Sequence, residues 1–147
     1  MSNDCVFCKV INGDVAANIV FEDSLSVAFL DHRPLFPGHC LLVPKEHIET
    51  LGDLPKKLIA PLFSNVQLLS QAVEQALAAE GSFVAMNNRV SQSVPHLHVH
   101  IVPRRRKDGL KGFFWPRNKY QSDEEIEMVQ KAIRSAVETL QRSPNGS

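Results

Sequence analysis

The feature that most constrains this chain is a strict alternation of histidine with apolar residues at positions 96–102, with the sequence His-Leu-His-Val-His-Ile-Val. Successive side chains of a β-strand point to opposite faces, so the three histidines are predicted to share one face. The apolar residues between them then line the other face and pack into a core. Imidazoles gain little from packing, because each ring nitrogen needs a hydrogen-bonding partner. The pattern therefore predicts a strand that is buried on one side and carries chemistry on the other.

Two other interpretations fit three histidines in a strand. One is a hydrogen-bonded surface strand that is rich in histidine without any chemical role. The other is a metal centre that uses all three rings, since His-x-His on a strand is a common ligand spacing.

Composition limits the class of protein. The chain has 147 residues, 44% hydrophobic and 22% charged, which suits one globular domain with a real core. Lys+Arg and Asp+Glu both count 16, and this balance argues against a nucleic-acid or anionic membrane partner. No secretory signal or membrane-spanning stretch is recognisable, and an odd cysteine count with a Cys5-x-x-Cys8 pair is typical of a reducing compartment. We therefore expect a cytoplasmic protein.

The rest of the chain predicts an α+β fold. Strands are expected at 19–21, 26–30, 39–43, 82–86 and 96–102, and helices at 7–11, at 55–79 and from 122 onward. Asp53 is expected to cap the long helix, and the spacing of Ser122 to Glu125 matches a capping box. Without βαβ alternation, an antiparallel sheet is favoured, with the long helix and the C-terminal helix packed on it. We expect one domain over residues 1–147, with a disordered tail at 143–147.

The long helix carries apolar residues at three- and four-residue spacing, which predicts that one of its faces packs on the core. These residues are Ile59, Leu62, Phe63, Val66, Leu69, Val73 and Leu77.

The histidine run resembles the signature of the histidine-triad (HIT) family of nucleotide hydrolases and transferases. The resemblance extends over most of the chain, through Cys5–Ile11, Phe29–Asp31, Pro37–His39, Val43–Ile48, Asn87–Asn88 and Gln92–Val94. It implies the HIT fold, a homodimer, and hydrolysis of an adenine nucleotide at the α-phosphate through a nucleotidyl-histidine that releases AMP. In that scheme the chemistry itself needs no metal.

The resemblance also implies roles for the catalytic residues. His98 is the nucleophile, and a neutral imidazole suits this task because its ordinary pKa is about 6.5. His100 contacts the phosphate and helps to protonate the leaving group. His39 orients the network, and His96 completes the catalytic set.

The substrate-binding residues implied by the resemblance fall into three groups. Asp31 takes the ribose hydroxyls. The wall of the base pocket comprises Val6, Phe7, Val10, Phe29, Leu30 and His32, and phosphate contacts come from Gln92, Ser93 and one of Asn87 and Asn88. Plain core packing is an equally good interpretation of Phe7, Val10 and Phe29.

The chain departs from the family pattern in the loop before the histidines, where Ser91 stands at a position that is typically glycine. The stretch from His100 to Arg104 is more similar to the Fhit-type and microbial branches of the family than to the Hint branch. That similarity favours dinucleoside polyphosphates over nucleoside phosphoramidates as substrates.

A second constellation comprises Cys5, Cys8, His47 and His96. Two cysteines and two histidines are a complete tetrahedral zinc set of the closed, structural kind. The resemblance implies the same, because several microbial members carry zinc at the matching positions. A structural zinc ion is therefore expected, with His96 tethering the end of the strand. The alternative is a pair of reduced thiols without a metal.

Two segments stay open to interpretation. The basic run Arg104–Lys107 with Lys111 is either a solvated face or a contact for the distal phosphates of the leaving group. The aromatic cluster Phe113–Trp115 covers the active site, lies in a dimer interface or fills a core gap.

Two other functions fit the same residues. One is a nucleotide-binding signalling or adaptor protein with negligible turnover, and the other is a transferase that passes the nucleotidyl group to phosphate.

Overall fold

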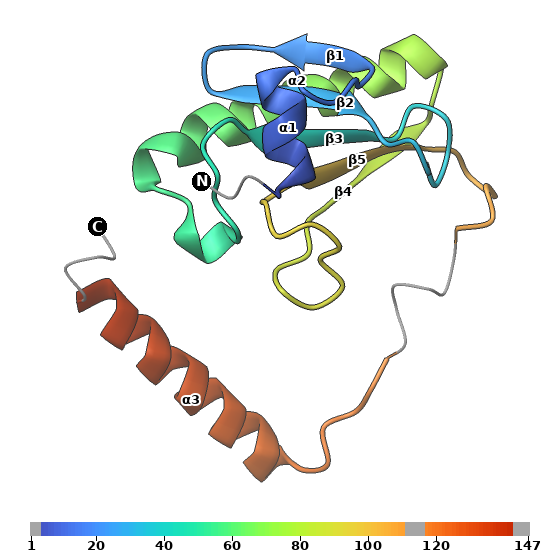
Figure 1. Cartoon of the computed structure of the whole chain (residues 1–147). Helices are drawn as coiled ribbons and strands as arrows, with labels where there is room; N and C mark the ends of the chain where they lie inside the picture. The colour runs from blue at the N-terminus through green and yellow to red at the C-terminus, as the bar shows by residue number, and fades with distance from the viewer. Residues whose placement is uncertain (1–3, 111–116, 143–147) are drawn as a thin grey trace. The chain divides into compact units, whose positions relative to one another are not determined.

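The computed structural model of the chain describes residues 4–110 and 117–142. It divides into two compact units, one ending at Asp108 and one starting at Gly109, which are described separately. The first unit contains, in order, α1 (Val6–Asn12), β1 (Ile19–Glu22), β2 (Ser26–Leu30), β3 (Cys40–Pro44), the 3-10 helix η1 (Leu51–Asp53), α2 (Lys56–Leu77), β4 (Gly81–Ala85) and β5 (Val99–Arg104) (Figure 1). The second unit contains α3 (Asp123–Arg142).

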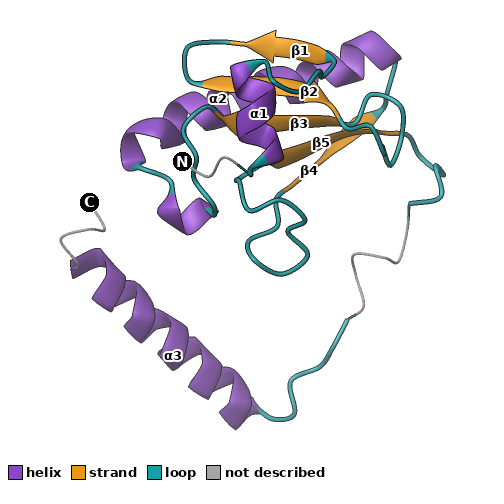
Figure 2. Cartoon of the chain, in the orientation of Figure 1, coloured by secondary structure: helices purple, strands orange, loops and turns teal. Residues whose placement is uncertain are grey.

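The strands form one five-stranded antiparallel sheet in the order β1-β2-β3-β5-β4 (Figure 2). The α+β prediction is therefore confirmed. Each expected strand lies within a few residues of an observed one. The histidine strand differs most, because regular pairing starts only at Val99 and continues to Arg104, so that His96–His98 lead into β5.

The sheet separates two clusters of buried side chains, as the alternation of each strand requires. One cluster takes Ala28, Leu42, Val99 and Ile101 from the sheet and Leu58, Leu62, Val66, Leu69 and Val73 from α2. The other takes Val27, Phe29, Leu41 and Val43 from the sheet and Phe7, Cys8 and Val10 from α1. Figure 1 shows α1 and α2 on opposite faces of the sheet. The predicted apolar face of β5 thus packs under α2, and its histidine face lies on the side of α1.

The core face of α2 is partly as predicted. Leu62, Val66, Leu69 and Val73 are buried, but Ile59 and Phe63 are 42% and 38% exposed, and Leu58 is buried instead. The buried face of α2 is therefore rotated slightly about the helix axis, away from Ile59 and Phe63 and toward Leu58.

The predicted cap of α2 is wrong. The N-cap residue is Pro55, which makes no side-chain hydrogen bond there, and Asp53 belongs to η1. The Asp53 carboxylate instead accepts a hydrogen bond from the Thr50 hydroxyl at 2.7 Å.

The capping box of α3 forms as its sequence indicates. The backbone N–H of Glu125 donates to Ser122 Oγ at 3.1 Å, and the Glu125 carboxylate accepts from the backbone N–H of Gln121 at 3.2 Å. The packing of α3 on the sheet and the single domain over residues 1–147 stay predictions, and the expected tail at 143–147 lies outside the described residues. Within the described ranges, no helix has the length and apolar character needed to cross a membrane.

Gly38 holds the loop between β2 and β3 against the end of α2. Its φ is +100°, a conformation that side chains rarely adopt. A Cβ atom at this position would lie 2.0 Å from Leu77 Cδ1 and 3.3 Å from Pro103 Cγ. Both the backbone conformation and the space therefore demand glycine, directly before His39.

We expect Gly38→Ala to lower the free energy of unfolding by about 2–4 kcal/mol, through backbone strain and overpacking together. Gly13→Ala is the matched control, because Gly13 has a φ of +84° with nothing within 4 Å of an added Cβ. That control should lose only the backbone contribution of about 1–2 kcal/mol. Urea denaturation of both variants measures the difference, and equal losses would contradict the steric argument.

Candidate active site

The register of the central strands brings together three polar groups that are distant in the sequence. Leu41 of β3 lies opposite His100 of β5, so His39, on the same face as Leu41, is the diagonal neighbour of His100. The Asp31 N–H donates to the His39 carbonyl oxygen at 2.9 Å and continues the pairing of β2 with β3. As a result, His39 Nε2 lies 3.0 Å from His100 Nδ1 and 3.7 Å from Asp31 Oδ2.

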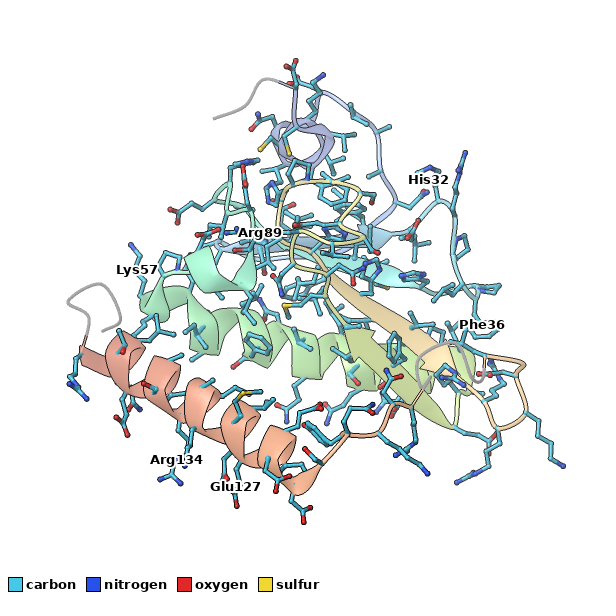
Figure 3. All side chains as sticks on the ribbon, turned by 90° about the horizontal axis from the view of Figure 1, so that it is seen from below. His32, Phe36, Lys57, Arg89, Glu127 and Arg134 are labelled. Carbon is cyan, nitrogen blue, oxygen red and sulfur yellow. The ribbon has the colours of Figure 1, made fainter. Side chains whose placement is uncertain are left out.

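A cavity of about 330 Å³ lies on this side of the sheet. Its lining brings together most of the predicted substrate and catalytic residues, namely Val6, Phe7, Val10, Phe29, Leu30, Asp31, His32, Ser93, His98 and His100. His32, which is labelled in Figure 3, lies on the segment that follows β2. The cavity thus joins an apolar wall, a carboxylate and two imidazoles, as a nucleotide site requires.

The lining also contains residues that the sequence analysis missed. These are Val15, Ala16, Ala17, Asn18, Leu41 and Val94. The segment from Val15 to Asn18 connects α1 to β1 and carries no motif, so a run of small apolar residues in a connection was its only signal.

Phe7 is at the same time core and cavity wall. It is only 7% exposed, yet it lines the cavity. Its ring centroid lies 5.1 Å from that of His98 and 5.4 Å from that of Phe29, both in edge-on geometry. Val10 and Phe29 are likewise buried in the core and line the cavity. The two interpretations of these residues are therefore compatible.

His98 is held in one tautomer. Its Nδ1 lies 2.7 Å from the carbonyl oxygen of His96, and a carbonyl oxygen only accepts hydrogen bonds. Nδ1 therefore carries a proton, and in the neutral form of the ring the lone pair is on Nε2. An imidazole with a free lone pair and an oriented second nitrogen is the form that a nucleophile needs.

The neighbouring rings of His39 and His100 are neutral at pH 7. Burial, followed by the neighbouring rings of His98 and His39, lowers the pKa of His100 to about 4, and Asp31 opposes this shift. Burial also lowers the pKa of His39, against the opposing charge of Asp31. Both rings therefore act through hydrogen bonds rather than through a positive charge.

His96 lies away from the cavity, in a cluster with the cysteine pair. Its ring is fully buried, and Nε2 lies 2.8 Å from the carbonyl oxygen of Pro44, to which it donates. Nδ1 then keeps its lone pair and faces Cys5 Sγ at 3.4 Å and Cys8 Sγ at 3.6 Å. Burial lowers the pKa of His96 and favours this neutral form. Its ring therefore belongs to the predicted metal set rather than to the cavity.

The cysteine–histidine cluster fits a tetrahedral zinc ion. Cys8 Sγ lies 3.2 Å from His47 Nδ1, and the ligand atoms of all four residues lie within 4.8 Å of one another. A tetrahedral ion with ordinary zinc bond lengths places sulfur and nitrogen ligands about 3.5 Å apart. The bond from His96 to the Pro44 carbonyl is the outer partner that metal-binding histidines usually have. Distances, donor types and burial all suit a closed structural site.

Two predicted phosphate ligands make hydrogen bonds to the backbone of neighbouring segments. Asn88 Oδ1 accepts from the Leu51 N–H at 2.8 Å, and neither Asn88 nor Gln92 lines the cavity. The Gln92 side chain donates to the Glu49 carbonyl oxygen at 2.6 Å and accepts from the Arg89 N–H at 2.8 Å. Both side chains therefore clamp the loop that carries Arg89, labelled in Figure 3, to the segment around η1. Ser93 is the predicted phosphate ligand that lines the cavity.

The basic run that begins at the last residue of β5 makes contacts within the protein at the far end of the sheet. Arg104 pairs with Asp108, Arg106 pairs with Glu80, and Arg105 donates to the carbonyl oxygen of Leu77. Arg104 stands four residues beyond His100, about 13 Å along a strand. These contacts favour a structural role over a phosphate contact. Lys111 and the cluster Phe113–Trp115 lie outside the described residues.

Comparison with known proteins gives a consistent result. A family model described as HIT domain matches residues 12–107. The adenylylsulfatase HINT3 of Arabidopsis thaliana is 38% identical over 112 residues, which are 75% of this chain and 57% of that protein. The chain thus spans little more than half of that relative. The adenosine 5'-monophosphoramidase of Schizosaccharomyces pombe is 35% identical over 135 residues, 90% of this chain and 98% of that protein.

A solved structure extends the comparison to the whole fold. A zinc-bound histidine triad family protein from Mycobacterium smegmatis matches with a TM-score of 0.70 at 32% identity, over 92% of this chain and 97% of that chain.

The departure at Ser91 places a serine in a backbone conformation that favours glycine. Ser91 has a φ of +61° and Arg89 a φ of +72°, in the left-handed region that glycine adopts without strain. We expect Ser91→Gly to raise the free energy of unfolding by about 0.5–1 kcal/mol, because relief of strain outweighs the added freedom of the unfolded chain. Ser24→Gly, at an exposed turn residue without positive φ, is the control and should lower it. A loss in both variants, measured by urea denaturation, would contradict the strain argument.

Proposed function

Because the chain belongs to the HIT domain family, we propose that it is a nucleotide hydrolase that cleaves at the α-phosphate with His98 as nucleophile. The observation that carries the proposal is the hydrogen bond from His98 Nδ1 to the His96 carbonyl, which directs the other ring nitrogen, Nε2, to the role of nucleophile. The cavity that His98 lines adds an apolar wall for a base and the carboxylate of Asp31 for a ribose.

The reaction proceeds in two displacements. His98 Nε2 attacks the α-phosphorus, the bond from phosphorus to the leaving group breaks, and the leaving group departs with the electron pair. Sulfate or a polyphosphate leaves as the anion, and the nitrogen of a phosphoramidate takes a proton from solvent and leaves as the amine. The Nδ1 proton remains on the ring and strengthens its bond to the His96 carbonyl as the ring becomes positive. Water then attacks the phosphorus of the nucleotidyl-histidine, loses a proton to solvent and releases AMP. His98 returns with its lone pair on Nε2.

The names of the two relatives support the substrate class. Adenylyl sulfate and adenosine 5'-phosphoramidate, the compounds in those names, both carry the leaving group on the α-phosphorus of an adenine nucleotide. They favour a mononucleotide with a small leaving group, whereas the end of the histidine motif favoured a dinucleoside polyphosphate. Both classes are cleaved at the same atom, so one site serves either.

We expect the wild-type protein to release AMP from adenylyl sulfate, adenosine 5'-phosphoramidate or a diadenosine polyphosphate, and His98→Ala to lose at least about 1,000-fold in kcat/KM. The loss follows because no other side chain replaces the nucleophile. Arg106→Ala is the control, because this 84% exposed side chain pairs with Glu80 away from the cavity. It should retain wild-type turnover.

Each other outcome of this assay has a distinct meaning. Equal rates in wild type and His98→Ala would remove His98 from the chemistry. AMP binding without turnover would identify a signalling or adaptor protein. Formation of ADP only when inorganic phosphate is present would identify a transferase.

We also propose that a structural zinc ion is held by Cys5, Cys8, His47 and His96. The distances between their ligand atoms support this, as does the zinc-bound relative of known structure. The ring of His96 would join the metal while its backbone carbonyl orients His98. The four ligands leave no open position, so the ion stabilises the fold and His98 carries the chemistry.

Purified wild-type protein is therefore expected to contain about one zinc per chain, and Cys8→Ala to lose it together with several degrees of Tm. Cys40→Ala is the matched control, because Cys40 is a buried free cysteine outside the cluster. It should keep its zinc. Elemental analysis and thermal melts with and without a chelator give the answer. Equal metal content in the wild type and both variants would exclude the proposed ligand set.

Three further features belong to the proposal. A homodimer is supported by the family and by β4, an edge strand on which Val84 is 40% exposed. A preference for adenine is supported by the names of both relatives. We also propose a cytoplasmic location, which the cysteine usage supports, and a single domain over residues 1–147, which the length of the chain supports.

A further inference from the structure

The hydrogen-bond network around His100 continues into the loop between β2 and β3. The backbone N–H of Leu35 donates to His39 Nδ1 at 3.1 Å. A backbone N–H can only donate, so Nδ1 of His39 must be the acceptor and carry no proton. In a neutral ring, the single proton of His39 is then on Nε2.

The proton on His39 Nε2 determines the state of the next ring. His100 Nδ1 lies 3.0 Å from His39 Nε2, closer than Asp31 Oδ2 at 3.7 Å. His39 therefore donates to His100, whose Nδ1 is an acceptor. The single proton of a neutral His100 is then on its Nε2.

We propose that the backbone amide of Leu35 sets the tautomer of His100 through His39, so that His100 presents a neutral Nε2–H to the phosphate of the substrate. Leu35 and His39 are positioning residues in this arrangement, and His100 is the group that touches substrate. The inference rests on the proposed function and specifies how one residue of that site works.

A neutral Nε2–H suits the chemistry of phosphate transfer. It donates a hydrogen bond to a phosphoryl oxygen without first having to lose or gain a proton. The charged and titratable groups that face His100 are His98, His39 and Asp31, and burial opposes any positive charge on its ring. A neutral imidazole gives up its remaining proton with difficulty. His100 is therefore a hydrogen-bond donor to the phosphate rather than the acid that protonates the leaving group.

The same geometry argues against a metal ion between these residues. Asp31, His39 and His100 offer ligand atoms within 4.8 Å of one another, which is also the spacing of a metal site. A metal on His39 Nε2 would move the ring proton to Nδ1. That proton would point at the N–H of Leu35, and two donors would face each other at 3.1 Å. The cluster is therefore a chain of hydrogen bonds.

The loop holds the Leu35 amide in place. The His39 N–H donates to the Phe36 carbonyl oxygen at 3.0 Å, and Asp31 Oδ1 accepts from the Arg33 N–H at 2.9 Å. Phe36 is labelled in Figure 3. The side chain of Leu35 is 48% exposed. The hydrogen bond to His39 comes from the backbone N–H, so it does not depend on which side chain residue 35 carries. Any residue except proline supplies the donor.

The test is Leu35→Pro, which removes the N–H, compared with Leu35→Ala, which removes the side chain and keeps the N–H. Long-range ¹H–¹⁵N spectra of histidine-labelled protein without substrate distinguish the two tautomers of each ring. We expect Nε2–H on His39 and His100 in the wild type and Leu35→Ala, and a loss of this preference at both rings in Leu35→Pro.

In turnover of adenosine 5'-phosphoramidate, Leu35→Pro should lose about tenfold in kcat with KM within about twofold. This loss is smaller than the complete removal of a donor causes. Unchanged tautomers in Leu35→Pro, or an Nδ1–H on His100 in the wild type, would overturn the proposal.

A second pair of variants keeps the test decisive if Leu35→Pro does not fold. In His39→Gln the side-chain amide nitrogen takes the place of Nε2 and donates to His100, whereas the shorter amide of His39→Asn corresponds to Nδ1 and does not reach it. We expect His39→Gln to keep the His100 tautomer and to exceed His39→Asn by about tenfold in kcat. The reverse order would contradict the inference. The spectra need no substrate, so an inactive wild-type protein would overturn the proposed function and leave the tautomer result standing.

Discussion

The hydrogen bond from His98 Nδ1 to the carbonyl oxygen of His96, 2.7 Å long, ties the reactive ring to the frame of the protein. The carbonyl belongs to a fully buried residue whose own ring has partners on both nitrogens. One is the carbonyl of Pro44 at the end of β3, and the other is the cysteine pair of the N-terminal segment. The orientation of His98 therefore depends on contacts that hold three separate segments together around His96.

Buried imidazoles are tolerated here because every ring nitrogen that faces the protein has a partner. Among the described residues, no buried side-chain nitrogen or oxygen lacks a hydrogen bond. The sheet makes this possible by separating two environments. Its face under α2 is filled mainly by apolar side chains, and its other face mixes Phe7, Val10 and Phe29 with the polar network. The apolar layer supports the geometry of the site, and the mixed layer supplies its chemistry.

The loop before the histidines shows how strain and hydrogen bonds are balanced near the site. Arg89 and Ser91 adopt positive φ without being glycine, which is unfavourable by itself. The side chains of Asn88 and Gln92 offset this through bonds to the backbone at Leu51, Glu49 and Arg89. The conformation of the loop is therefore stabilised by hydrogen bonds to neighbouring segments. Ser93, at the end of the loop, lines the cavity.

Much of the arrangement was predictable from the sequence because it depends on side-chain type and period. The alternation at 96–102 identified the buried face of β5, the Cys-x-x-Cys pair with His47 and His96 identified a candidate metal set, and Ser122 with Glu125 identified the start of α3. Polarity, ligand chemistry and capping are properties of the residues themselves, so a pattern of residues is enough to predict them.

Only the tertiary structure decided which of several possible partners each group has. The amides of Asn88 and Gln92 suit a phosphate as well as a backbone, and in the structure they bind the backbone at Leu51 and Glu49. The core face of α2 took Leu58 over Ile59 and Phe63, because the sheet that it covers sets its rotation. The donor from Leu35 to His39 was beyond prediction for a simpler reason. Every residue except proline has the same backbone N–H, so no residue type marks it, and only the fold determines where it points.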